Sequence, residues 1–155
     1  MNDAPLPPPR RVITGLDAQG KSCVLVDGPP LSLGGGGGAM AWRSEALPAD
    51  NAVQQDITPV PFDFDLMHGG GSMFMVMDYP PGMQAFWHAT DTLEYIAMLH
   101  GEIVLELETG EVTLRAGDVL ADRGVIHSWR NDSGKVARAA IVILPALPAG
   151  KGRTV

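Results

Sequence analysis

The sequence lacks the features that mark several large classes of protein. Among its 155 residues there is one cysteine, Cys23, which excludes an internal disulfide framework. No run of lysine or arginine exceeds the pair Arg10–Arg11, and the formal net charge is -7. Nothing in the sequence therefore provides the basic surface that nucleic acid or an anionic membrane requires. We expect neither a nucleic-acid partner nor a membrane partner.

Long apolar runs are scarce as well. The stretch MNDAPLPPPRR has no apolar core of the length that a signal peptide needs, and no segment approaches the length of a membrane span. A single thiol also fits a reducing compartment. We therefore expect a cytoplasmic protein.

The residues that are present suffice for one globular domain rich in strands. The chain is 45% hydrophobic, so it can bury a core without disulfides or structural metals. Its 19 glycines and 13 prolines are too frequent for a helical bundle, and its apolar residues fall in short clusters bounded by turn residues. We predict an all-β fold, with a flexible Pro-rich arm at 1–9, a single domain at 10–147 and a flexible tail at 148–155.

The first part of the domain predicts a β-hairpin. Two β-branched runs, RRVIT and CVLVD, are joined by GLDAQG, which supplies turn residues. The letters GLDAQGKS also match the phosphate-binding P-loop pattern, but the space between Ser22 and the next turn, GPP, admits a strand and no helix. Further along, the run of glycines 34–38 predicts a flexible loop, and strands are expected over 39–47 and 72–79.

From residue 83 onward, strand-length segments follow at intervals of roughly ten residues, as in an all-β sandwich or barrel. Residues of equal parity share one face of a strand. His88 and Glu94 then share a face, and His127 lies on a later strand. If both faces point into one barrel, two imidazoles and a carboxylate meet as the ligands of a facial triad.

The chemistry of this constellation leaves two interpretations open. As a metal site it suits Fe(II), and Mn, Ni or Zn with less selectivity. Without a metal, the Thr90 hydroxyl can hydrogen bond to His88 and the residues form a polar pocket. A buried Glu94 carboxylate is costly when unpaired, so it requires a cation or a proton-sharing partner.

Other side chains of the same parity are expected to line a substrate pocket. They are Phe86, Thr90, Met98 and Trp129. Trp87 and Tyr95 have the opposite parity and are expected to point away from the histidines.

The spacing of these residues resembles the two motifs of the cupin superfamily. The first, G-x5-H-x-H-x3,4-E-x6-G, is matched with threonine in place of the second histidine by Gly82, His88, Thr90, Glu94 and Gly101. The second, G-x5-P-x-G-x2-H-x3-N, is matched one residue shorter and with arginine in place of proline by Gly117, Arg123, Gly124, His127 and Asn131. The sequence is most similar to small bacterial single-domain cupins, and the likeness is specific over residues 80–145.

This resemblance implies a double-stranded β-helix, a jelly-roll barrel of two antiparallel sheets whose mouth holds metal and substrate. It also implies that His88, Glu94 and His127 are metal ligands. Thr90 departs from the pattern because a hydroxyl cannot replace an imidazole as a neutral nitrogen donor.

Three functions follow as hypotheses. The first is a metal-dependent enzyme of dioxygenase, isomerase or dehydratase type, with Glu94 and His127 as catalytic residues and a small organic substrate. The second is a metal-free enzyme in which His127 or Glu94 acts as general acid or base. The third is a non-enzymatic ligand-binding module. A homodimer is also expected, in which the arm at 1–14 crosses to a neighbour to cover an edge strand.

Overall fold

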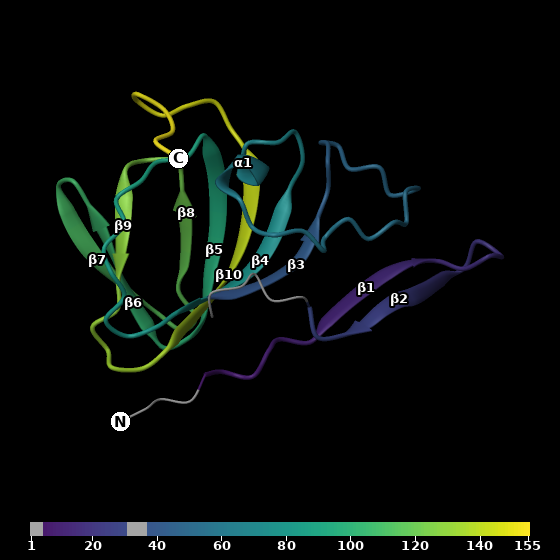
Figure 1. The fold of residues 1–155 in the computed structure, drawn as a ribbon, viewed down its shortest axis with the longest axis horizontal. Coiled ribbons are helices and arrows are strands. Elements are labelled where there is room, and N and C mark those ends of the chain that lie inside the picture. The colour runs from purple at the N-terminus through teal and green to yellow at the C-terminus, as the bar shows by residue number, and fades with distance from the viewer. Residues whose placement is uncertain (1–4, 31–36) are drawn as a thin grey trace.

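A computed structural model describes residues 5–30 and 37–155. Within these ranges the chain forms strands in three antiparallel groups and one short helix (Figure 1). The glycine loop predicted over 34–38 lies mostly outside the described residues, as do the first four residues of the predicted arm.

The predicted hairpin is confirmed. β1 (Arg11–Leu16) pairs with β2 (Ser22–Gly28), and the two strands project from the rest of the molecule (Figure 1). Asp17 closes the turn, because its Oδ1 accepts the backbone N–H groups of Gln19 and Lys21, both at 2.9 Å. The letters that match a P-loop therefore form strand, turn and strand, and a strand to Gly28 stands where a P-loop has its helix.

The larger sheet holds five strands. In spatial order they are β3 (Gly38–Arg43), β4 (Met73–Tyr79), β10 (Ala137–Pro145), β5 (Thr92–His100) and β8 (Val119–Asp122). β3 and β4 confirm the strands expected over 39–47 and 72–79, although β3 ends earlier than expected. The central position of β10 buries its alternate residues.

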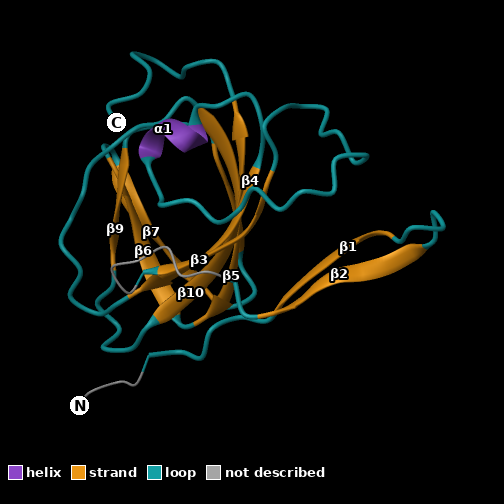
Figure 2. Cartoon of the chain, turned by 45° about the vertical axis from the view of Figure 1, so that its right-hand side comes forward, coloured by secondary structure: helices purple, strands orange, loops and turns teal. Residues whose placement is uncertain are grey.

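The smaller sheet packs across from the larger one, so the domain has two layers (Figure 2). Its order is β7 (Gly110–Arg115), β6 (Glu102–Leu107) and β9 (His127–Arg130). Helix α1 (Phe64–Met67), which was not foreseen, begins after Asp63, whose side chain accepts the Asp65 N–H as an N-cap. The predicted all-β jelly roll of two antiparallel sheets is confirmed.

Methionines fill much of the interior between the two sheets. Buried members of the core include Met40, Met67, Met73, Met75 and Met98. Such side chains are flexible and adapt to an irregular space. No helix of the described residues has the length and apolar character needed to span a membrane.

The expected parity of β5 holds. Thr92, Glu94, Ile96 and Met98 are buried, whereas Tyr95 is 50% exposed. Trp87 is also exposed, as expected for a side chain that points away from the histidines.

Residues of the segment 148–155, predicted as a flexible tail, make hydrogen bonds to the body of the domain. The backbone N–H of Thr154 donates to the Ala89 carbonyl at 2.9 Å, and the Arg153 N–H donates to Asp91 Oδ1 at 2.9 Å. The reason is that the backbone just before β5 has free polar groups that the tail can satisfy. At the other end of the chain, the Pro7 carbonyl accepts a hydrogen bond from Arg138 at 2.8 Å.

Candidate functional site

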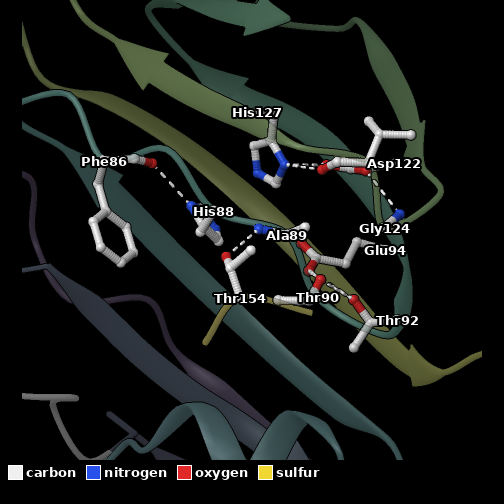
Figure 3. Close-up of polar contacts among 11 residues, drawn as sticks. Phe86, His88, Ala89, Thr90, Thr92, Glu94, Asp122, Gly124, His127 and Thr154 are labelled. Carbon is white, nitrogen blue, oxygen red and sulfur yellow. Dashed lines mark hydrogen bonds and ion pairs between the residues drawn. The ribbon is translucent and has the colours of Figure 1, made fainter. Parts of the chain in front are cut away.

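Two histidines from separate segments form the centre of the candidate site. His88 and His127 are joined by reciprocal backbone N–H···O bonds, both 3.0 Å long. Their ring centroids are 4.5 Å apart (Figure 3). The structure therefore brings together the two imidazoles that the sequence placed on different strands.

Both imidazoles are held in the same way. Nδ1 of His88 lies 2.9 Å from the Phe86 carbonyl oxygen, and Nδ1 of His127 lies 2.9 Å from the Val125 carbonyl oxygen. A carbonyl can only accept, so each Nδ1 carries a proton, and in the neutral imidazole each Nε2 then has a free lone pair. Each Nε2 is thus available as a base or as a ligand.

His127 has a buried carboxylate beside it that the sequence did not reveal. Asp122 Oδ2 lies 3.1 Å from His127 Nδ1, and the two side chains are 3% and 2% exposed. Because the Nδ1 proton points at the Val125 carbonyl, Oδ2 acts on the ring through its charge and is otherwise unpaired within the described part of the chain. Asp122 Oδ1 is fixed by the Gly124 N–H at 3.0 Å. The Val125 carbonyl therefore orients the ring, and Asp122 places a carboxylate beside it.

Glu94 lies next to this pair, directly across from Asp122 in the register of β5 and β8. The Thr92 hydroxyl donates to Glu94 Oε1 at 3.0 Å. The Thr90 hydroxyl lies 2.6 Å from that of Thr92 and 3.4 Å from Oε1. Burial, and after it the charge of Asp122, raises the pKa of Glu94, which the two hydroxyls only partly offset. Glu94 therefore keeps its proton to a higher pH than an exposed glutamate.

The pKa of the other histidine, His88, is lowered. Burial is the main cause that lowers the pKa of His88, and the neighbouring His127 adds to it. The hydrogen bond to Phe86 opposes this effect without cancelling it.

Aromatic rings flank the two histidines. Phe86 stacks on His88 with centroids 4.9 Å apart, and Trp129 meets the edge of His127 at 5.6 Å. Phe86 is 51% exposed, so the Phe86 side of the histidine pair faces solvent. Of the predicted pocket residues, Phe86, Thr90 and Trp129 lie against the histidines or Glu94, whereas Met98 belongs to the hydrophobic core.

The structure does not gather the predicted ligands His88, Glu94 and His127 into a metal centre. Among the described residues, no three His, Cys, Asp or Glu side chains form a group that could hold a metal ion. The two imidazoles have suitable free Nε2 atoms, but Glu94 is engaged with the hydroxyls of Thr90 and Thr92. The donor types are those of a facial triad, but among the described residues the three side chains do not come together as one.

Comparison with known proteins identifies the family of this chain. A family model described as a cupin domain matches residues 75–144. The phomopsin biosynthesis cluster protein C' of Diaporthe leptostromiformis is 34% identical over 151 residues, which cover 90% of this chain and 80% of that protein. The chain belongs to the cupin superfamily. This cupin is also 29% identical over 147 residues to the cupin-domain-containing oxidoreductase srdB of Neurospora crassa, covering 90% of this chain and 75% of that protein.

Among solved structures, the cupin domain of an XRE family transcriptional regulator from Enterobacter cloacae matches with a TM-score of 0.43 and 18% identity. The match covers 56% of this cupin and 90% of that chain. The two curated relatives named above are fungal, so the likeness to small bacterial cupins expected from the motifs finds no support in them.

Sequence reasoning missed Asp122 and Thr92. Thr92 has the parity of Thr90 and Glu94, so the same rule that found them could have found it. Asp122 had no such signal, because its role depends on the pairing of β8 with β5, which the sequence does not specify.

The raised pKa of Glu94 predicts a pH-dependent effect of its substitution. A carboxyl whose pKa is raised in the folded state binds more protons when folded, so it lowers stability as pH rises from its ordinary 4.5 through the folded value. Glu94→Gln removes this loss of stability, because glutamine does not titrate. We expect the variant to gain stability over the wild type across that window and to hold the gain at higher pH, as measured by urea unfolding at several pH values. A difference that is independent of pH would show that folding does not raise the pKa of Glu94.

Proposed function

We propose that this cupin is an enzyme that acts on a small organic molecule by acid–base catalysis, without a metal held by its own side chains. His127 is the base, the Val125 carbonyl orients it, Asp122 supplies a neighbouring carboxylate, and Glu94 is the acid. The observation that carries the proposal is the buried His127–Asp122 pair, in which Nε2 is left free.

The geometry supports a two-proton scheme. His127 Nε2 takes a proton from the substrate, and Asp122 stabilises the imidazolium that forms. Glu94, whose pKa is raised by burial, delivers its proton to another atom of the substrate. Such a scheme moves hydrogen within the substrate or eliminates water from it, so it needs no external oxidant.

The relatives support a small organic substrate. Phomopsin biosynthesis cluster protein C' and the oxidoreductase srdB carry names that refer to biosynthesis or to enzymatic activity. The aromatic rings beside the histidines, and the methionine-rich interior behind them, suit an apolar molecule better than a highly charged one.

Hydrogen exchange tests the function on a range of compounds, so the natural substrate need not be identified first. The protein is incubated in D2O with a panel of small carbonyl compounds that have acidic C–H bonds, with and without EDTA, and deuterium uptake is followed by mass spectrometry. We expect uptake by at least one compound at a rate that EDTA does not change. Uptake that stops with EDTA and returns with Fe, Mn, Ni or Zn would instead favour the metal-dependent enzyme. A compound that binds but never exchanges would favour a ligand-binding module.

We also propose that the protein is a homodimer that uses the projecting hairpin. Four hairpin side chains are 40% to 57% exposed although apolar, namely Val12, Leu16, Val24 and Leu25. The outer face of the larger sheet also has an apolar hollow, lined in part by Phe74, Tyr95 and Val119. Burial of both apolar surfaces in a dimer would stabilise the protein. Sedimentation should give a dimer for the wild type and a monomer for Val12→Asp with Val24→Asp, and a monomeric wild type at micromolar concentration would contradict the proposal.

A further inference from the structure

The segment that carries His88 and Thr90 has little regular structure of its own. β5 begins only at Thr92, and before it the one strand-like contact is the bridge between His88 and His127. That bridge uses the N–H and carbonyl of His88, which point toward β9. The next residue, Ala89, directs its own N–H and carbonyl the other way, as alternation along an extended chain requires. Something must satisfy these groups, since Ala89 is buried.

Residues 152–154 satisfy them. The Thr154 N–H donates to the Ala89 carbonyl at 2.9 Å, and the Ala89 N–H donates to Thr154 Oγ1 at 3.0 Å (Figure 3). Two positions further on, Asp91 Oδ1 accepts the Arg153 N–H at 2.9 Å. The backbone from His88 to Asp91 is thus held between His127 on one side and the C-terminal residues on the other.

The approach of the C-terminal residues depends on Gly152. Its φ is +81°, and a Cβ there would lie 3.1 Å from Pro148 Cβ and 3.2 Å from Asp91 Oδ1. A side chain at this position would therefore be strained and would also push against the acceptor of the Arg153 N–H. Gly150 has a similar φ of +58°, but a Cβ there would meet nothing within 4 Å.

Residues of helix α1 and its C-cap also hydrogen bond to Arg153 and Asp91. Arg153 donates to Asp65 Oδ1 at 3.1 Å, and the Asp91 N–H donates to His68 Nε2 at 3.2 Å. His68 is the residue at the C-cap of α1. Both Arg153 and Asp91 are therefore linked to the helix as well as to each other.

We propose that residues 152–154 are a positioning element of the site, which holds the 88–91 segment so that His88 stays against His127 and Thr90 stays beside Glu94. Thr154 acts through Ala89, and Arg153 acts through Asp91. The inference deepens the proposed function, because it names what keeps one wall of the acid–base site in place. Its test measures the position of His88 and requires no turnover, so it can fail while the proposed chemistry stands.

Two variant pairs test the proposal. Thr154→Val keeps the shape of the side chain but removes the acceptor of the Ala89 N–H, and Thr154→Ser restores it. Gly152→Ala introduces a Cβ against Asp91, and Gly150→Ala introduces one into open space. Amide exchange of Ala89 is measured by NMR. Modification of His88 by diethyl pyrocarbonate is followed by mass spectrometry, with the exposed His100 as internal reference.

We expect the Ala89 amide of Thr154→Val to exchange roughly five-fold faster, the usual effect of one lost hydrogen bond. His88 should become more reactive relative to His100 in Thr154→Val and Gly152→Ala, and should stay as in the wild type in Thr154→Ser and Gly150→Ala. Thermal unfolding of each variant separates this effect from loss of fold. Unchanged reactivity of His88 in folded Thr154→Val and Gly152→Ala would overturn the proposal, since a purely structural role lowers the unfolding temperature without moving His88.

Discussion

Replacing His127 by glutamine is expected to lower kcat at this site by about 10²–10⁴-fold, the usual loss when a general base is removed. Glutamine has a neutral amide that can occupy similar space, but it has no nitrogen able to accept a proton. Because proton transfer occurs in the transition state, the loss should fall on kcat with KM nearly unchanged. The measurement uses steady-state kinetics on the compound that shows deuterium uptake.

His100→Gln is the matched control for this variant. His100 also directs Nδ1 at a carbonyl, that of Val136 at 3.1 Å, but it is exposed at the end of β5. Its substitution should leave kcat within a factor of about two, as is usual for surface changes away from special features. Equal losses in His127→Gln and His100→Gln, or no loss in either, would contradict the assignment of His127 as the base.

Gly124→Ala is expected to destabilise the fold by roughly 2–5 kcal/mol, the sum of left-handed backbone strain and overpacking. The φ of Gly124 is +71°, and a Cβ there would lie 2.4 Å from the Thr90 carbonyl oxygen and 3.0 Å from that of Thr92. Both contacts are with backbone atoms, which cannot swing away as a side chain can. The same N–H that fixes Asp122 belongs to Gly124, so the substitution should disturb the site as well as the fold.

Gly82→Ala separates the cost of left-handed backbone strain from the cost of overpacking. Gly82 has a φ of +69°, but a Cβ there would meet nothing within 4 Å. Its substitution should cost about 1–2 kcal/mol, the backbone strain alone. Urea unfolding of both variants measures the difference. If Gly124→Ala cost no more than Gly82→Ala, the close approach of Gly124 to Thr90 and Thr92 would be refuted.

Much of the fold follows from local patterns in the sequence. The hairpin of β1 and β2 was predictable because turn residues and β-branched runs specify it within 18 residues of chain, Arg11 to Gly28. The parity of β5 was predictable because one of its faces is buried, so Glu94 and Tyr95 point in opposite directions. Short helix α1 was missed because a single turn between prolines and glycines gives no periodic pattern.

The site was predictable only in part. Parity and motif spacing placed His88 and His127 together, and the structure pairs their backbones. Parity and motif spacing did not predict Asp122. Its contact with His127 arises from the packing of one strand against another, which no local pattern encodes. Parity and spacing also left the partner of Glu94 open between a cation and a protonated group. In the structure the hydroxyls of Thr92 and Thr90 contact Glu94. The docking of residues 152–154 had no sequence signal, since single hydrogen bonds from a polar tail are not periodic.

The central claim, that His127 is a base with a free Nε2 and not one arm of a metal centre, is tested most directly by the imidazole nitrogens themselves. A long-range ¹H–¹⁵N NMR spectrum of uniformly labelled protein reports the state of each nitrogen of His88 and His127 before and after one equivalent of Zn²⁺. We expect Nδ1 to be protonated and Nε2 unprotonated in both residues, and Zn²⁺ to leave both Nε2 signals in place. Joint movement of the two Nε2 signals, saturating at one equivalent, would contradict this expectation and would make the site a metal centre.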